Sequence, residues 1–256
     1  MNVAIVTGAA RGIGAATVAR LANDGYRVVA VDGCAGDVGR YSLASTSDLE
    51  AVAAPFGDQV VTIVGDVRDR TVLKLAVEAA VDRWGRLDVA VAGAAIVGGG
   101  APLWETPVED LRELFEVDVL GVWNLAQGCL PEMLRGPQPS RCRFVAIASA
   151  AGSNGLFHLA AYNVVKHAVI GLVRGLAADL VGTGVTACAV SPGSTDTPML
   201  AETARLYGVT TEQLAARQGI RRLLSPDEVA ETLAFACSAA GAVLHGSVVD
   251  ASGGFR

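Results

Sequence analysis

Apolar residues are arranged along the chain in two alternating patterns. Short runs of consecutive apolar residues, typical of buried strands, alternate with longer segments of helix-forming residues. This alternation predicts an α/β fold, with one mostly seven-stranded parallel sheet and helices on both faces. The expected strands are Val3–Thr7, Arg27–Val31, Val60–Val64, Val89–Ala92, Phe144–Ser149, Val185–Val190 and Ser247–Asp250.

A glycine-rich segment follows the first expected strand. It runs from Thr7 to Gly14 as TGAARGIG, and helix-forming residues from Ala15 to Asp24 come next. Glycines let the backbone turn tightly and approach a ligand, and the free N–H groups of a helix start attract an anion. Strand, glycine turn and helix in this order are typical of a site for dinucleotide phosphates. The spacing, G-x-x-x-G-x-G, differs from the more common G-x-G-x-x-G.

The second expected strand ends next to Asp32, which bears on the choice of nucleotide. An acidic residue at this distance beyond a glycine loop accepts hydrogen bonds from the adenine ribose and repels a 2′-phosphate. Arg11 in the loop favours NADP instead, and an ordinary loop aspartate is an alternative interpretation of Asp32. Because the carboxylate is expected nearer the ribose than the guanidinium, we expect the protein to favour NAD.

The most specific chemical signal is Tyr162 with Lys166, four residues apart, and Ser149 thirteen residues upstream. A four-residue spacing places a phenol and an ammonium side by side on one helix face. The cation favours the phenolate, so the pair is a candidate general acid/base that works nearer neutral pH than a lone tyrosine. A surface pair without function is the alternative, but the chain has only two lysines, the other being Lys74.

Together these residues resemble the short-chain dehydrogenase/reductase family over nearly the whole chain. The T-G-x-x-x-G-x-G motif of the family falls on Thr7 to Gly14, and its Y-x-x-x-K motif falls on Tyr162 to Lys166. The resemblance implies a single doubly wound Rossmann domain, 1–256, with a nucleotide-binding half to about 140 and a catalytic half from about 141. It also implies NAD-dependent oxidoreduction of an alcohol, with Tyr162 as general acid/base, Ser149 holding the substrate oxygen and Lys166 assisting both phenol and nicotinamide ribose.

Other family motifs extend the expected cofactor site. An acidic residue beside the adenine matches Asp66, and a P-G-x-x-x-T segment that touches the nicotinamide carboxamide matches Pro192 to Thr197. The predicted cofactor-binding residues are Gly8, Arg11, Gly12, Ile13, Gly14, Asp32, Asp66, Val67, Ala92, Gly93, Ala94, Tyr162, Lys166, Pro192, Gly193, Thr195 and Thr197.

Two positions depart from the family pattern. The N-N-A-G motif is Ala92-Gly93-Ala94-Ala95 here, so the structural side chain of its first asparagine is missing. The further active-site asparagine of the family aligns with Asp118, whose main-chain carbonyl would hold a water of a proton relay. We therefore include Asp118 among the predicted catalytic residues, although its carboxylate bears on the relay geometry and the pH profile.

Segments after the fourth, fifth and sixth strands are expected to form the substrate pocket, because ligands of open α/β sheets bind beyond the carboxyl ends of the strands. The candidate set is mostly apolar, which favours a small secondary alcohol or ketone over a sugar or acid; plain packing is the alternative. Met199 to Gly219 could fold as a lid. The candidates are Ile96, Trp104, Asn154, Leu156, Phe157, Met199 and Tyr207.

A narrower resemblance rests on the long connection after the second strand, Gly33–Asp58, and on Pro102 to Pro107. Both stretches resemble an actinobacterial subfamily linked to the redox peptide mycofactocin. That resemblance implies NAD that is held without exchange and reoxidised by mycofactocin as external acceptor. A variable surface loop is the alternative, and the sequence leaves the two open.

Charge and composition exclude several classes of function. A net charge of −6 argues against nucleic-acid binding, which needs a basic surface. Five cysteines without C-x-x-C spacing are expected to be free thiols in a reducing cytoplasm, and no targeting segment, membrane span or metal-ligand set is evident. Surplus apolar residues on helices Val108–Leu134 and Ala160–Val181 indicate a homotetramer, the assembly common in the family. The alternatives are a non-catalytic NAD-binding regulator or scaffold, and an epimerase or dehydratase.

Overall fold

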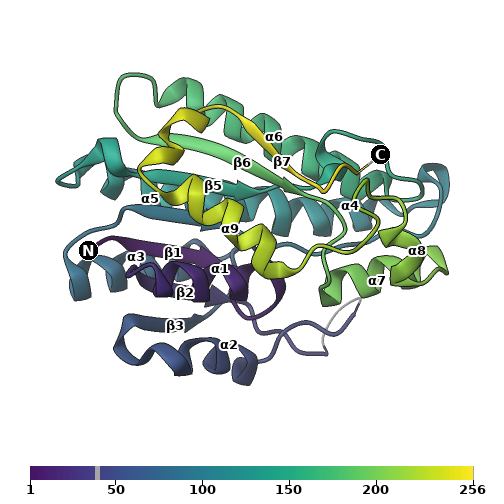
Figure 1. The fold of residues 1–256 in the computed structure, drawn as a ribbon, viewed down its shortest axis with the longest axis horizontal. Coiled ribbons are helices and arrows are strands. Elements are labelled where there is room, and N and C mark those ends of the chain that lie inside the picture. The colour runs from purple at the N-terminus through teal and green to yellow at the C-terminus, as the bar shows by residue number, and fades with distance from the viewer. Residues whose placement is uncertain (38–40, 256) are drawn as a thin grey trace.

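Seven parallel strands form one sheet in the order β3-β2-β1-β4-β5-β6-β7 (Figure 1). The computed structural model describes residues 1–37 and 41–255. The predicted α/β class with a seven-stranded parallel sheet is confirmed. The strands are β1 Val3–Thr7, β2 Arg27–Asp32, β3 Val60–Val64, β4 Val89–Ala92, β5 Arg143–Ile147, β6 Thr186–Pro192 and β7 Val248–Ala251.

Helices cover both faces of the sheet, as expected for strands that are buried on both sides. One face packs against α1 Gly12–Asn23, α2 Thr46–Ala53 and α9 Pro226–Cys237. The other packs against α3 Arg70–Trp84, α5 Gly121–Arg135 and α6 Ala160–Asp179. Shorter helices are α4 Val108–Leu114, α7 Pro198–Tyr207 and α8 Thr211–Ala215. Short 3-10 turns span Ala54–Gln59, Leu103–Glu105, Pro139–Arg141, Ala150–Gly152 and Ala240–Leu244.

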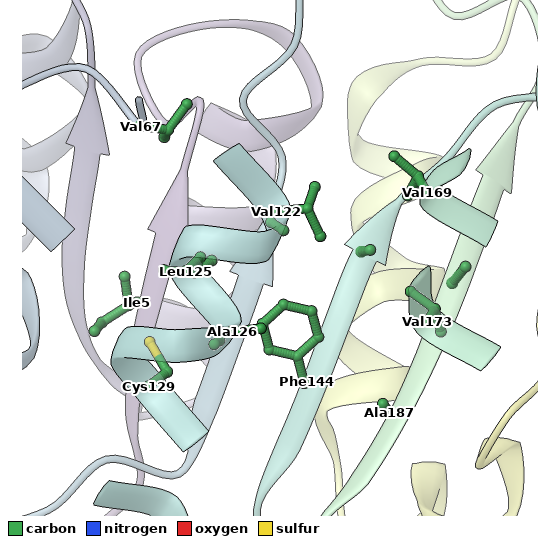
Figure 2. Packing of buried hydrophobic residues seen from close by; sticks show 14 of the residues in the cluster. Ile5, Val67, Val122, Leu125, Ala126, Cys129, Phe144, Val169, Val173 and Ala187 are labelled. Carbon is green, nitrogen blue, oxygen red and sulfur yellow. The ribbon is translucent and has the colours of Figure 1, made fainter. Parts of the chain in front are cut away.

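The face under α5 and α6 holds a continuous apolar core (Figure 2). Phe144 on β5 is fully buried and belongs to the same cluster as Leu125 and Cys129 on α5 and Val169 and Val173 on α6. Full burial of an aromatic ring contributes about 1.5–3 kcal/mol relative to exposure. This packing fixes both helices on the sheet, and α6 carries the predicted Tyr–Lys pair.

The expected helix Val108–Leu134 is continuous but contains one turn of π-helix. Residues Phe115–Leu120 form this wider turn between α4 and α5. Asp118 and Val119 within it are buried, while Phe115 and Leu120 are exposed. Single π-turns inside α-helices occur frequently at functional sites. The sequence pattern alone did not predict this turn, because its apolar spacing is close to that of an ordinary helix.

The order in which successive strands are added to the sheet reverses next to β1, and such a reversal leaves a crevice at the carboxyl edge of the sheet. β2 and β3 lie on one side of β1, and β4 to β7 lie on the other. In open α/β sheets, ligands bind beyond the carboxyl ends of the strands at this switch point. The segments that follow β1, β2, β4, β5 and β6 therefore meet where the sequence predicts a nucleotide.

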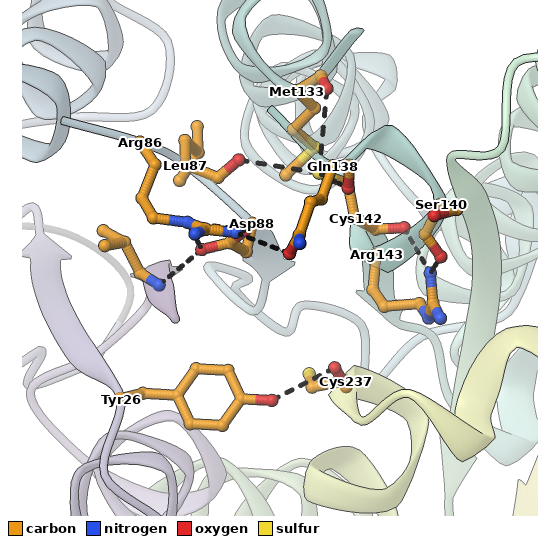
Figure 3. A network of polar contacts seen from close by, with 11 residues as sticks. Tyr26, Arg86, Leu87, Asp88, Met133, Gln138, Ser140, Cys142, Arg143 and Cys237 are labelled. Atoms are coloured by element: carbon orange, nitrogen blue, oxygen red, sulfur yellow. Dashed lines mark hydrogen bonds and ion pairs between the residues drawn. The ribbon is translucent and has the colours of Figure 1, made fainter. Parts of the chain in front are cut away.

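A buried polar network ties the opposite, amino edge of the sheet (Figure 3). The Val3 N–H donates to Asp88 Oδ2 at 2.8 Å, and Arg86 donates to the same carboxylate. Arg143, which is 2% exposed, donates to several main-chain carbonyls, including that of Ser140. These contacts anchor the starts of β1, β4 and β5 against one another. Within the described part of the chain, no helix is long and apolar enough to cross a membrane.

We expect Asp88→Ala to lower the free energy of unfolding by about 2–4 kcal/mol, because it leaves a buried N–H and a guanidinium without their acceptor. Urea or thermal unfolding measures the change. Asp82→Ala, which removes an exposed carboxylate from α3, is the matched control and should change stability little. Equal stability of the two variants would contradict the anchoring role of Asp88.

Candidate active site

A cavity of about 260 Å³ lies at the carboxyl edge of the sheet. Its walls come from the glycine loop after β1, the connection after β2, the segments after β4, β5 and β6, and the helices α6 to α8. A second hollow adjoins it beside the segment after β3 and shares Gly8, Asp32, Tyr41 and Leu43 with it. The two hollows form an elongated crevice, the shape that a dinucleotide requires.

The glycine loop is packed so tightly that side chains would displace it. Gly8 has a positive φ of 69°, and a Cβ there would lie 2.7 Å from the backbone of Gly93 and Ala94. A Cβ on Gly14 would overlap the Gly8 carbonyl oxygen. These glycines let the loop and the start of α1 lie against neighbouring backbone, which leaves N–H groups available to an anion.

Thr7 joins the loop to the segment after β4. Its hydroxyl accepts hydrogen bonds from the Gly93 N–H at 3.1 Å and the Ala94 N–H at 3.3 Å. The hydroxyl also lies 3.5 Å from the Val91 carbonyl oxygen. The segment that lacks the asparagine of the family motif is therefore held to β1 by main-chain contacts to Thr7.

Asp32 faces the glycine loop from the end of β2. Its Oδ2 accepts from the Ala10 N–H and its Oδ1 from the Cys34 N–H, both at 3.0 Å. Arg11 donates instead to the Ser42 carbonyl at 2.9 Å. The carboxylate thus lies in the crevice, as predicted, while the guanidinium holds the connection after β2.

The connection after β2 lines both hollows, although none of its residues was among the predicted site residues. Tyr41 and Leu43 line both of them, and the Val97 N–H lies 3.4 Å from the Tyr41 hydroxyl. Two main-chain hydrogen bonds between Gly36 and the segment 43–44 fold the connection back on itself. Residues 38–40 of this connection lie outside the described residues. The signal in the sequence that could have identified Tyr41 is its bulky side chain among mostly small residues.

Ser149, Tyr162 and Lys166 all line the cavity. The four-residue spacing predicted that Tyr162 and Lys166 lie together, and the family resemblance implied that Ser149 joins them. Ser149 lies two residues beyond β5 in extended conformation, and its Oγ accepts from the Ala151 N–H at 3.1 Å. Tyr162 and Lys166 lie on α6 and are 8% and 3% exposed. Lys166 Nζ is 5.4 Å from the centre of the Tyr162 ring, and the Ser149 side chain lies next to the phenol.

Asp118 approaches this group from the π-turn. Its Oδ2 lies 3.0 Å from Lys166 Nζ, in the geometry of an ion pair rather than of an aligned hydrogen bond. Its Oδ1 accepts from the Ile96 N–H at 2.9 Å. The sequence predicted a role for the main-chain carbonyl of Asp118; the direct contact of its side chain with the lysine was not foreseen.

The three buried groups shift one another's ionisation. Burial, reinforced by Asp118, raises the pKa of Tyr162 above its usual value and outweighs the opposing effect of Lys166. Burial also raises the pKa of Asp118 against the opposing lysine. For Lys166, burial acts to lower the pKa, but Asp118 and Tyr162 together raise it. The expectation that Lys166 brings the phenol toward neutral pH is therefore corrected, because burial and a nearby carboxylate counter it.

Most of the predicted cofactor residues lie along the crevice. Those that line the first cavity are Gly8, Arg11, Gly12, Ile13, Gly14, Asp32, Gly93, Tyr162, Lys166, Pro192, Gly193, Thr195 and Thr197. Asp66, Val67 and Ala94 line the second hollow. Ala92 is instead buried within β4 and does not reach either hollow. A glycine at position 12 also fits the cradle, because a Cβ there would press on Thr197 at 3.0 Å.

The predicted substrate residues divide into two groups. Leu156, Met199 and Tyr207 line the first cavity, and Ile96 lines the second hollow. Trp104, in the 3-10 turn Leu103–Glu105, and Phe157 are 82% and 69% exposed and line neither hollow.

Asn154 is also outside the cavity, because its amide donates to the Ala150 carbonyl. Residues that complete the cavity without having been predicted include Leu159, Leu214, Arg217 and Phe255. Among residues 1–37 and 41–255, no three His, Cys, Asp or Glu side chains gather into a possible metal site.

Comparison with known proteins adds relatives that match over most of the chain. A family model described as "Enoyl-(Acyl carrier protein) reductase" matches residues 8–256. The chain is 34% identical over 254 residues to a cis-4-hydroxycyclohexanecarboxylate dehydrogenase of Sinomonas cyclohexanicum, covering 99% of this chain and 96% of the relative. It is 32% identical over 231 residues to a (−)-trans-carveol dehydrogenase of Rhodococcus erythropolis, covering 88% and 77%.

Solved structures of dehydrogenases share the fold of this chain. The structure of a carveol dehydrogenase from Mycobacterium avium in complex with NAD superposes with a TM-score of 0.91. It is 26% identical in sequence and covers 99% of this chain and 96% of that one. The elongated crevice described above thus belongs to a fold that holds a dinucleotide in a related protein.

Proposed function

The chain belongs to the short-chain dehydrogenase/reductase family, and we propose that it interconverts a small, largely apolar secondary alcohol and its ketone with NAD as the hydride carrier. One observation carries this proposal: Ser149, Tyr162 and Lys166 converge in a cavity that also contains the glycine loop and Asp32. The two relatives described above are named dehydrogenases of hydroxyl compounds, which act on CH–OH groups. We further propose that residues to about 140 bind the nucleotide and that residues from about 141 supply most of the chemistry.

The residues that would hold the dinucleotide are distributed along the crevice. Main-chain N–H groups of the glycine loop would face the phosphates, and Asp32 would accept the ribose hydroxyls. Asp66 and Val67, which line the second hollow, would face the adenine, while Thr195 and Thr197, beyond β6 in the first cavity, would face the nicotinamide. When bound, NAD supplies the carbon that accepts or donates the hydride.

The proposed proton chemistry follows from the three buried side chains. In alcohol oxidation, the phenolate oxygen of Tyr162 accepts the proton of the substrate hydroxyl as hydride leaves the carbon that bears this hydroxyl. The Ser149 hydroxyl donates a hydrogen bond to the substrate oxygen and fixes its position. The Lys166 ammonium stabilises the phenolate and would donate to the nicotinamide ribose of a bound NAD. Ketone reduction runs these steps in reverse, with the phenol as acid.

The walls around the catalytic group support an apolar substrate. Leu156, Leu159, Met199 and Leu214 line the cavity, and Met199 Sδ lies 3.9 Å from the Tyr162 hydroxyl. Apolar walls stabilise a hydrocarbon skeleton by excluding water from it. The alcohols named in two relatives, cis-4-hydroxycyclohexanecarboxylate and (−)-trans-carveol, are therefore the first substrates to test.

We also propose that NAD leaves this protein slowly and is reoxidised in place, with mycofactocin as the electron acceptor. Support comes from the connection after β2, which contributes Tyr41 and Leu43 to both hollows and is held by Arg11 through Ser42. A segment that closes over a ligand slows dissociation, and affinity differences between related complexes lie mostly in that rate.

A homotetramer completes the proposal. Large apolar side chains are exposed on the helical face formed by α4, α5 and α6, among them Val108, Trp123 and Val164. Phe235 on α9 and Val243 are exposed elsewhere on the surface. Two separate apolar surfaces would allow two kinds of twofold contact, as a tetramer with dihedral symmetry requires.

Tyr162→Phe tests the central claim. Because it removes the proton acceptor while keeping the ring, we expect the oxidation rate of either test alcohol to fall about 10²–10⁴-fold with NAD binding nearly unchanged. Tyr26→Phe, at the amino edge of the sheet, is the matched control and should retain activity. Substantial turnover by Tyr162→Phe would eliminate the proposed mechanism. Absence of turnover in the wild-type protein with intact NAD binding would favour a non-catalytic role.

Asp32→Ala tests the nucleotide preference. A carboxylate facing a 2′-phosphate costs binding energy, so we expect the preference for NAD over NADP to narrow at least about tenfold in this variant. Titration of both nucleotides into protein stripped of bound cofactor measures the ratio. Asp58→Ala, in an exposed turn before β3, should leave the ratio unchanged. Equal wild-type affinities for the two nucleotides would contradict the assignment of Asp32.

Native mass spectrometry tests retention of NAD and subunit number together. We expect four subunits, each carrying NAD after purification, because the connection after β2 slows release. With alcohol alone, the protein should complete about one turnover per site, and an artificial electron acceptor should restore cycling. Rapid multiple turnover with added NAD, from protein purified empty, would refute slow exchange and leave the dehydrogenase proposal standing. A monomer would refute the proposed assembly.

A further inference from the structure

The ion pair between Asp118 and Lys166 is the most completely buried contact between opposite charges in the described residues. The two side chains are 0% and 3% exposed, and their charged atoms are 3.0 Å apart. Each other ion pair found in this part of the chain has at least one partner whose side chain is more than 20% exposed. Removing two charges from water is costly, so such a contact persists only with favourable geometry.

The fold holds the carboxylate of Asp118 at both oxygens. Oδ1 accepts from the Ile96 N–H in the segment after β4, and Oδ2 faces Lys166 on α6. The π-turn that carries Asp118 is the only π-turn in the described chain, and α6 packs against this turn and against α4. Three separate segments thus meet at one carboxylate, which fixes its position relative to α6.

The position of the pair couples it to the proton chemistry. Lys166 lies one helical turn after Tyr162. Its ammonium has three N–H donors, and Asp118 lies against one side of this group. The other titratable groups near Asp118 and Tyr162 are Tyr41, from the connection after β2, and, more distantly, Arg11. Tyr41 is neutral in the working pH range because burial raises its pKa. Asp118 is therefore the anionic side chain that directly offsets the charge of Lys166.

We propose that Asp118 is a positioning residue of the dehydrogenase reaction: its side-chain carboxylate holds Lys166 and sets the net charge that faces Tyr162. This inference deepens the proposed function and rests on it for the chemistry, but the ion pair itself can be tested without turnover. It differs from the main-chain role that the sequence resemblance implied for this position. Asp118 acts through Lys166 and does not touch the substrate.

The direction of the effect follows from charge. With Asp118 ionised, the Asp118–Lys166 pair is neutral, so loss of the Tyr162 proton leaves a buried net negative charge. Asp118→Asn leaves the lysine unneutralised, and the same proton loss then gives a neutral pair. Because the groups titrate together, the apparent pKa of the phenol falls in the variant.

The first experiment is a pH profile of kcat/KM for alcohol oxidation, measured with whichever of cis-4-hydroxycyclohexanecarboxylate and (−)-trans-carveol the wild-type protein oxidises faster. We expect the acidic limb to move to lower pH by roughly one to two units in Asp118→Asn. Asp118→Glu retains the charge and should keep the wild-type profile. Glu109→Gln, which removes an exposed carboxylate from α4, should also leave it unmoved. A lower kcat in Asp118→Asn with an unmoved acidic limb would indicate a merely structural role and overturn the proposal.

The second experiment uses the two lysines of the chain and needs neither substrate nor variant. Lysine labelled with ¹³C at Cε gives two NMR signals, and Lys74, which is exposed on α3, serves as the internal reference. We expect Lys166 to keep its proton above pH 10.5, because Asp118 and Tyr162 raise its pKa. Loss of that proton below pH 10.5, as burial without a carboxylate partner would cause, would overturn the proposal. An inactive protein that still shows the raised value would instead refute only the proposed function.

Discussion

The parallel direction of all seven strands is the constraint on which the rest of the structure depends. After each strand the chain must return to the amino edge before the next strand begins. Helices therefore cover both faces, and every strand ends at the same edge. The glycine loop, Asp32, Ser149 and the segment after β6 are far apart in sequence and still share one crevice. At the amino edge, where the strands begin, the side chains of Asp88 and Arg143 form hydrogen bonds with buried main-chain N–H and carbonyl groups.

Close backbone approach is the second determinant of the site. Gly8 and Gly14 lie where a Cβ would overlap neighbouring main chain, so the loop can reach both a ligand and the segment after β4. The hydroxyl of Thr7 holds the segment after β4 by accepting hydrogen bonds from the Gly93 and Ala94 N–H groups. The cradle therefore tolerates Ala92-Gly93-Ala94 because its contacts are to main-chain atoms rather than to the missing side chain.

Buried charge shapes the catalytic end. Burial alone makes the phenolate of Tyr162 costly, and Lys166 offsets that cost only in part because Asp118 neutralises it. An exposed Tyr–Lys pair would behave differently, since water would screen both charges. An aspartate at position 118, where the family motif has asparagine, thus places a carboxylate beside Lys166 that counters the effect of the lysine on Tyr162.

The sequence by itself determined the order of elements, the class of fold and the pairing of Tyr162 with Lys166, because strand runs, glycine spacing and a four-residue helical repeat are local properties. Only the tertiary structure decided which side chains face the cavity. Trp104 and Phe157 are apolar and follow the expected strands, yet their side chains are exposed to solvent, whereas Tyr41 lines the crevice from the connection after β2. The contact of Asp118 with Lys166 depends on a π-turn and on three segments meeting, and long-range packing of this kind leaves no periodic trace in a single sequence.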